Sequence, residues 1–387
     1  MRRRSEFLPE IECITKLEDL EAAYAQRFGA APFNISHWDP SEEFHREMLQ
    51  HLEMPALSSA INYRFSYQIE QTKPVLSKLG GCEAHHELLF TPSSTSSILC
   101  ALNWLRSLGI RRMLVACPAY FSVFHASRRF GIELGKIYLR RTNGEFSLPN
   151  PRSRTWRKPA ALWLTSPVYG AGVYLSPDAI AFVSRLLESG WSVIADECLA
   201  LPGNELIRTL GRHANFMSIY SPHKSVCVNG VKVSALIYDA KHGRLLDQWA
   251  DVWYGGLGCS SSAAIAHFLS GNFDSYLSAF LKAIEEQHRR FQLTCEAEGV
   301  EIDLSAKGHF VSCYFPALPS GLGNSARFME RLIYATGGSL ISGNRSRLHG
   351  TIGFSFRVNL ARSGALFDPT LARIVRYLAN CIRSLNK

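Results

Sequence analysis

Charge is scarce in this sequence, and long apolar runs are absent. Of its 387 residues, 19% are Asp, Glu, Lys or Arg, and 47% are hydrophobic. The apolar runs are far shorter than a membrane span, and no apolar stretch follows the basic opening MRRR. We therefore expect neither a membrane segment nor a secretory signal. A chain of this length can bury a large core, which predicts a globular protein of two or three domains.

Paired cysteines are also missing. The ten cysteines are scattered, and none of them forms a C-x-x-C pair. This argues against a zinc ribbon and against a disulfide scaffold. Most of the cysteines lie within apolar runs, where a reduced thiol packs as a small hydrophobe. We therefore expect a reducing, cytoplasmic location.

The net charge of +9 comes without a nucleic-acid pattern. The basic residues are dispersed, and no basic stripe with interleaved aromatic residues is present. We expect no nucleic-acid partner, and the positive charge favours anionic small molecules as ligands. The sequence contains no internal repeat and no low-complexity tract.

Short apolar runs alternate with helical periods from about residue 85 onward. Runs such as HELLFT, RRMLVAC and WSVIADE read as buried strands between helices. This alternation predicts an α/β fold with a mostly parallel sheet and flanking helices. Two later strand patterns, GHFVSCYFP and GFSFRVNLA, predict a smaller α+β domain at the C-terminal end. We expect an N-terminal segment (1–60), a large domain (61–285) and a small domain (286–387).

Hydroxyl residues follow the first of these strands. Ser94 and Thr95 stand where a helix begins after HELLFT. Free N–H groups at a helix N-terminus suit a phosphate group, and hydroxyls can add hydrogen bonds. Simple capping of the helix is the plainer alternative.

Two later strand ends carry charged residues. Asp196 and Glu197 end the run SVIADE, where a carboxylate could hold a metal, act as a base or pair with a cation. A solvated strand end is the alternative. Lys224 follows the apolar run FMSIY, and a buried lysine is costly unless it is paired or neutralised. Lysines so placed are often nucleophilic, although an exposed loop lysine explains the pattern equally well.

The order and spacing of these residues resemble the class I/II aminotransferases, pyridoxal-phosphate (PLP) enzymes of the aspartate aminotransferase fold, also called fold type I. The resemblance extends from about residue 30 to the end. Lys224 matches the lysine that forms a Schiff base with the cofactor, and it is followed by Gly230 and by the phosphate-binding Lys232, where arginine is commoner. Asp196 matches the aspartate that pairs with the pyridinium nitrogen.

Further motifs of that family occur in the same order. Tyr120 in the triplet PAY matches the ring that stacks on the cofactor, and SPVYGAG (166–172) matches a conserved turn of the family. Arg357 in FRVNLA matches the arginine that holds the substrate α-carboxylate. The segment NISHWDP resembles the early segment that lines the substrate pocket, which makes His37 and Trp38 candidate substrate-binding residues.

The resemblance also implies a phosphate site and a homodimer. The phosphate site would be formed by Ser94, Thr95, Ser221 and Lys232. Tyr63 and Tyr67 both fall where a tyrosine of a partner subunit would reach the phosphate, and the sequence leaves that choice open.

Two positions depart from the family. Tyr169 replaces the asparagine, and Leu199 the tyrosine, that usually donate hydrogen bonds to the 3-oxygen of the cofactor. We expect the Tyr169 hydroxyl to be the single donor, since a buried phenol needs a partner. The alternative is that Tyr169 only packs and that water serves the oxygen.

The resemblance implies an enzyme that forms an external aldimine with an L-α-amino acid and removes its Cα proton through Lys224. An aminotransferase is the first expectation. The alternative is a PLP-dependent lyase or cyclase of specialised metabolism that performs β- or γ-elimination, replacement or ring closure. A cofactor-binding regulator is a third possibility, but we find no helix-turn-helix pattern before the α/β domain.

Overall fold

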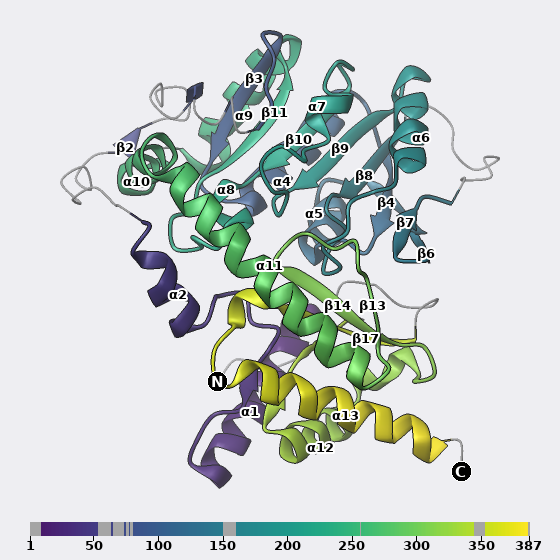
Figure 1. Cartoon of the computed structure of the whole chain (residues 1–387). Helices are drawn as coiled ribbons and strands as arrows, with labels where there is room; N and C mark the ends of the chain where they lie inside the picture. Colours follow the sequence, from purple (N-terminus) through teal and green to yellow (C-terminus); the bar gives the residue numbers. More distant parts are fainter. Residues whose placement is uncertain are drawn as a thin grey trace. The chain divides into compact units, whose positions relative to one another are not determined.

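The computed structural model describes residues 9–52, 63–64, 73–74, 77, 80–149, 160–255, 257–343 and 353–385. The chain divides into two compact units (Figure 1). The large unit consists of residues 48–169 and 173–281. The small unit consists of residues 1–47, 170–172 and 282–387.

A seven-stranded sheet forms the centre of the large unit, in the order β3-β11-β10-β9-β8-β4-β5 (Figure 1). Its strands are β3 (His86–Thr91), β4 (Arg112–Cys117), β5 (Glu133–Tyr138), β8 (Ala161–Thr165), β9 (Ser192–Glu197), β10 (Phe216–Tyr220) and β11 (Ser234–Asp239). Only β11 runs antiparallel to its neighbours in this sheet. The predicted α/β fold with a mostly parallel sheet is therefore confirmed.

Helices cover this sheet because its strands present apolar side chains. The helices α4 (Ser94–Ser107), α5 (Phe121–Arg129) and α9 (Gly243–Tyr254) share one buried cluster with strand residues that include Trp163 and Ile219. The other helices of this unit are α6 (Pro177–Glu188), α7 (Ile207–Leu210), α8 (Pro222–Ser225) and α10 (Cys259–Ser270). Two short strand pairs complete it: β6 (Arg140–Thr142) with β7 (Glu145–Ser147), and β2 (Tyr63–Arg64) with β12 (Leu257–Gly258).

An antiparallel sheet in the order β13-β14-β17-β16 forms the centre of the small unit. Its strands are β13 (Glu301–Ile302), β14 (Phe310–Phe315), β16 (Ile341–Ser342) and β17 (Phe354–Asn359), and a parallel pair joins β1 (Phe33–Asn34) to β15 (Gly338–Ser339). The helices of this unit are α1 (Pro9–Phe28), α12 (Ala326–Thr336) and α13 (Phe367–Leu385), with α2 (Glu42–Leu49) and α11 (Phe273–Ala297) crossing the unit boundary. Sheet and helices together give the α+β arrangement that the sequence predicts.

None of the described helices combines the length and the apolar character that crossing a membrane requires.

Candidate active site

The candidate residues of the large unit gather at one edge of the seven-stranded sheet. The strands β3, β4, β8, β9 and β10 run parallel, so their carboxyl ends meet at the same edge. Ligands of open α/β sheets bind at this edge. The residues at or shortly after these strand ends include Ser94, Tyr120, Tyr169, Asp196 and Lys224.

Asp196 is a buried carboxylate near the end of β9. It pairs in register with Thr165 of β8 and Ile219 of β10, and its side chain is 6% exposed. Burial raises the pKa of Asp196, and a hydrogen bond from the Cys198 thiol and then the charge of Lys224 oppose that rise. Within the described part of the chain, no cation forms an ion pair with Asp196. A cationic ligand group at this position would therefore hold the carboxylate ionised.

Lys224 lies close to the ring of Tyr120. The chain leaves β10 at Tyr220 and turns at once into the single turn of α8, in which Lys224 N donates to Ser221 O at 3.0 Å. The Lys224 side chain is half-buried, and its Nζ lies 6.0 Å from the Tyr120 ring centroid. The Tyr120 and Tyr169 ring centroids lie 6.1 Å apart. The fold thus brings together side chains from three separate strand ends.

Serine hydroxyls form a buried cluster at the start of α4. Ser93 caps this helix by accepting from Ser96 N at 3.2 Å, so capping does not occupy Ser94. Ser94 Oγ lies 3.0 Å from Ser221 Oγ, which lies 2.6 Å from Ser234 Oγ. We call Ser94, Ser221 and Ser234 the hydroxyl cluster. Thr95 is exposed beside it.

Ser234 was not among the residues predicted from the sequence. Its only sequence signal is a serine inside the apolar run VKVSALIYD, and its role in the cluster depends on the placement of β11. Ser234 pairs in register with Thr91, which brings the start of β11 to the carboxyl end of β3.

Lys232 lies on the exposed loop before β11, and its charge contributes to a lowered pKa of His223. Burial is the main cause, followed by the charge of Lys224, and together they lower the pKa of His223 to about 4. The His223 ring nitrogen Nδ1 lies 2.7 Å from Val233 O. His223 is therefore neutral at neutral pH and anchors the loop.

Gly230 lies in the same loop. An added Cβ at Gly230 would meet no described atom within 4 Å, so the surrounding chain does not itself require glycine there.

The remaining positions singled out in the large unit are described by the structure only in part. Tyr169 and Leu199 are both half-buried, Leu199 in the turn after β9. The donor role of Tyr169 stays a prediction. Tyr63 belongs to β2, but its side chain and all of Tyr67 lie outside the described residues.

The turn after β8 is shaped by its glycines. Gly172 has φ +71°, and a Cβ added there would lie 2.1 Å from the carbonyl oxygen of Phe310. Ser312 Oγ donates to Gly170 O at 2.8 Å. Residues 170–172 therefore belong to the small unit by contact, although β8 belongs to the large unit.

Arg357 lies in β17 of the small unit and is 5% exposed. Its Nη2 donates to Ser36 O at 2.7 Å, and its guanidinium carbon lies 4.3 Å from the Trp38 ring centroid. His37 is exposed and accepts from Asp39 N at 3.1 Å. Trp38 therefore contacts Arg357, whereas the ring of His37 is bonded to the backbone of Asp39.

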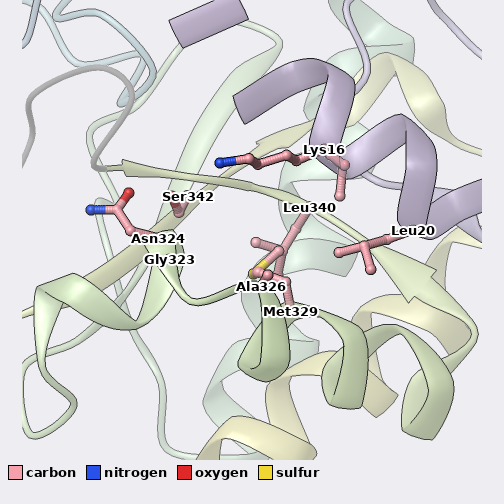
Figure 2. Close-up of a pocket in the computed structure, with 9 residues that line it drawn as sticks. Lys16, Leu20, Gly323, Asn324, Ala326, Met329, Leu340 and Ser342 are labelled. Atoms are coloured by element: carbon pink, nitrogen blue, oxygen red, sulfur yellow. The ribbon is translucent and has the colours of Figure 1, made fainter. Parts of the chain in front are cut away.

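A small cavity of about 50 Å³ lies elsewhere in the small unit (Figure 2). It is lined by Lys16, Leu17, Leu20, Gly323, Asn324, Ala326, Met329, Leu340 and Ser342. None of the predicted site residues lines it, and ligand pockets commonly measure about 300–1,000 Å³. The cavity is therefore too small to hold a cofactor. The described residues also contain no cluster of His, Cys, Asp and Glu suited to a metal ion.

The chain is similar in structure to several solved aminotransferases. An aspartate aminotransferase double mutant from Thermus thermophilus matches with a TM-score of 0.74 and 15% identity, over 98% of this chain and 99% of that chain. The N-succinyldiaminopimelate aminotransferase of Mycobacterium tuberculosis matches at 0.70 and 19%, over 94% and 96%. The kynurenine aminotransferase of Pyrococcus horikoshii, in a complex with PMP, matches at 0.72 and 15%, over 96% and 95%.

No family model and no curated protein matches the chain by sequence. The structural matches show the fold of aspartate aminotransferase. They differ in the substrates for which they are named, so the fold leaves the substrate open.

Proposed function

We propose that the protein is a PLP-dependent aminotransferase acting on an L-α-amino acid. One observation carries the proposal. A buried carboxylate (Asp196), a lysine (Lys224) and an aromatic ring (Tyr120) meet at the carboxyl edge of a sheet whose fold is that of aminotransferases. The matched solved structures are aminotransferases, and nothing in the described site favours elimination or ring closure over transamination.

The residues at this edge fit PLP. Asp196 has a pKa raised by burial and no ion-pair partner among the described residues, so a protonated ring nitrogen would supply the missing positive charge. Ser94 and Ser221 place hydroxyls beside the N-terminus of α4, which suits a phosphate group. Tyr120 would stack on the ring. Lys232 would add charge at the phosphate and Tyr169 a donor at the 3-oxygen.

PLP, when bound, supplies an electron sink that acidifies the Cα–H of an amino acid. The chain's own residues do the rest. Lys224 would take the Cα proton with its free amine and then give it to a carbon of the cofactor, so its Nζ would have to lie close to both carbons. Asp196 would keep the ring nitrogen of the cofactor charged, and Arg357 would bind the substrate carboxylate with its planar guanidinium.

We also infer a cytoplasmic homodimer in which Tyr63 or Tyr67 of the partner subunit contacts the phosphate. Sedimentation of the full chain would test the dimer. A monomer at the concentrations used for activity would contradict it.

Borohydride reduction followed by peptide mapping tests the proposal at Lys224. The PLP-loaded protein is expected to show a visible absorbance band that borohydride removes, leaving the cofactor mass on the peptide that contains Lys224. Lys224→Ala should lose both signals. Lys241→Ala, which changes an exposed lysine of the same unit, should keep both. Cofactor attached to another lysine, or to none, would sink the proposal.

A further inference from the structure

Two aromatic rings hold the guanidinium of Arg357 in the small unit. The guanidinium carbon lies 4.3 Å from the ring centroid of Trp38 and 4.7 Å from that of Phe310. Both distances are well inside the range of cation–π contacts. The two rings lie 4.9 Å apart at an interplanar angle of 74°. We call Trp38 and Phe310 the aromatic clamp.

Hydrogen bonds fix the segment that carries Trp38. Asn359 Nδ2 donates to His37 O at 2.8 Å and to Trp38 O at 3.3 Å. Asn359 N donates to Ile35 O at 2.8 Å. The segment is thus tied to β17, the strand that also carries Arg357. The backbone of Trp38 is therefore held close to the strand that carries Arg357.

Ser36 forms two hydrogen bonds with Arg357. Its carbonyl accepts from Arg357 Nη2 at 2.7 Å, and its hydroxyl donates to Arg357 O. The same hydroxyl accepts from Ile341 N at 2.9 Å, and Ile341 is the β16 neighbour of Arg357 in register. Both the backbone and the side chain of Arg357 are thus held by one residue.

The aromatic clamp stabilises the positive charge of the Arg357 guanidinium. A buried charge is costly unless polar or aromatic groups compensate it, and two ring faces do so here. His309, which neighbours the Phe310 ring, has its pKa lowered to about 3, first by burial and then by the charge of Arg357. It stays neutral and adds no second positive charge.

We infer that Trp38 is a positioning residue for Arg357: it fixes the plane of the guanidinium and thereby sets the affinity for the substrate carboxylate. A guanidinium held in one orientation loses little freedom when it binds a carboxylate through both nitrogens. The inference rests on the proposed function only in assigning Arg357 to that carboxylate. Trp38 acts through Arg357, whichever amino acid is the substrate.

The test compares three substitutions in the full-length, PLP-loaded protein. Maleate is the probe, because it carries carboxylates but no amino group and cannot react. Trp38→Leu is expected to weaken maleate binding about tenfold in calorimetry, equivalent to about 1.4 kcal/mol. Trp38→Phe should recover most of the loss, since it restores a ring. Trp253→Leu is the control, because Trp253 is 41% exposed and packs on Phe130 of the large unit.

Kinetics add a second readout. Trp38→Leu should raise KM for an amino-acid substrate about tenfold and leave kcat within about twofold, because only binding of the carboxylate is weakened. A purely structural role would lower kcat and thermal stability together. Trp38→Met, which keeps bulk but no ring face, carries the same test if the leucine variant does not fold.

Arginine labelling separates this inference from the proposed function. Phenylglyoxal should label Arg357 faster in Trp38→Leu than in wild type, and maleate should protect Arg357 in wild type. Labelling is carried out on the protein with and without PLP, so these readouts stand even if Lys224 binds no PLP, which would end the proposed function alone. The inference is overturned if Trp38→Leu binds maleate as wild type does, if Trp253→Leu loses as much, or if maleate leaves Arg357 unprotected.

Discussion

Adjacent residues of β9 carry two buried carboxylates with different surroundings. Asp196 is bonded by Cys198 and feels the charge of Lys224. Glu197 accepts from the hydroxyl of Ser218 and from the N–H of Leu206. Successive side chains of a strand point to opposite faces, so only Asp196 belongs to the candidate site. The apolar pattern of the strand does not distinguish the two carboxylates, and the choice of Asp196 depended on the family resemblance, because the contacts that distinguish them come from distant segments.

Replacing Asp196 with asparagine is expected to stabilise the cofactor-free protein and to weaken its binding of PLP. Burial raises its folded pKa above the ordinary value, so its contribution to stability is present below the unfolded pKa and lost as pH rises. Asp196→Asn should therefore raise the melting temperature of the cofactor-free protein at pH 7. It should also weaken PLP binding about tenfold or more, because a charge-assisted hydrogen bond is lost. Thermal unfolding with and without PLP measures both effects, and unchanged PLP affinity would contradict the role of Asp196.

Glu197 is expected to make the stability fall with rising pH. Burial, and to a smaller extent the charge of Glu205, raise the pKa of Glu197 to about 8, against the hydrogen bonds from Ser218 and Leu206. The stability due to this raised pKa is full below about 4.5 and is lost as pH rises through about 8. Urea unfolding of wild type and Glu197→Gln across this window should show the steeper fall in wild type. Equal slopes of the unfolding free energy against pH in the two proteins would contradict the raised pKa of Glu197. The substitution Glu197→Gln should leave PLP binding unchanged.

Among the elements, the sequence predicted the strands of the large sheet but not the direction of β11. Apolar runs with flanking turns indicate a buried strand, whereas direction depends on how the chain returns. The antiparallel β11 places Ser234 beside Ser221, which is why this third member of the hydroxyl cluster was not predicted from the sequence, although Ser94 and Ser221 were. The aromatic clamp was not predicted either, because Trp38 and Phe310 are distant in the chain.

Two glycines of the matched motifs are expected to respond differently to alanine. Gly172→Ala forces a Cβ against the Phe310 carbonyl at a positive φ, so we expect it to destabilise the protein by about 2–4 kcal/mol. Gly230→Ala meets no described neighbour and should change the unfolding free energy by less than about 0.5 kcal/mol. Chemical unfolding compares the two. Similar losses at both positions would contradict the packing described for the turn.

At the scale of the whole molecule, the fold and the activity rest on different observations. The TM-scores of 0.70–0.74 at 15–19% identity show that this sequence builds the fold of aminotransferases. A fold hosts many activities, so the function must come from the site. We propose that Lys224, Asp196 and the hydroxyl cluster carry it, and the differing substrates named for the matched structures leave the substrate open.

The half-reaction tests the central claim most directly. PLP-loaded protein is incubated with a panel of L-α-amino acids, and the products are identified by mass spectrometry. We expect pyridoxamine phosphate and the matching 2-oxo acid from wild type and Lys241→Ala, and neither product from Lys224→Ala. Loss of a side-chain group or a new ring with PLP retained would contradict it, as would equal turnover without Lys224.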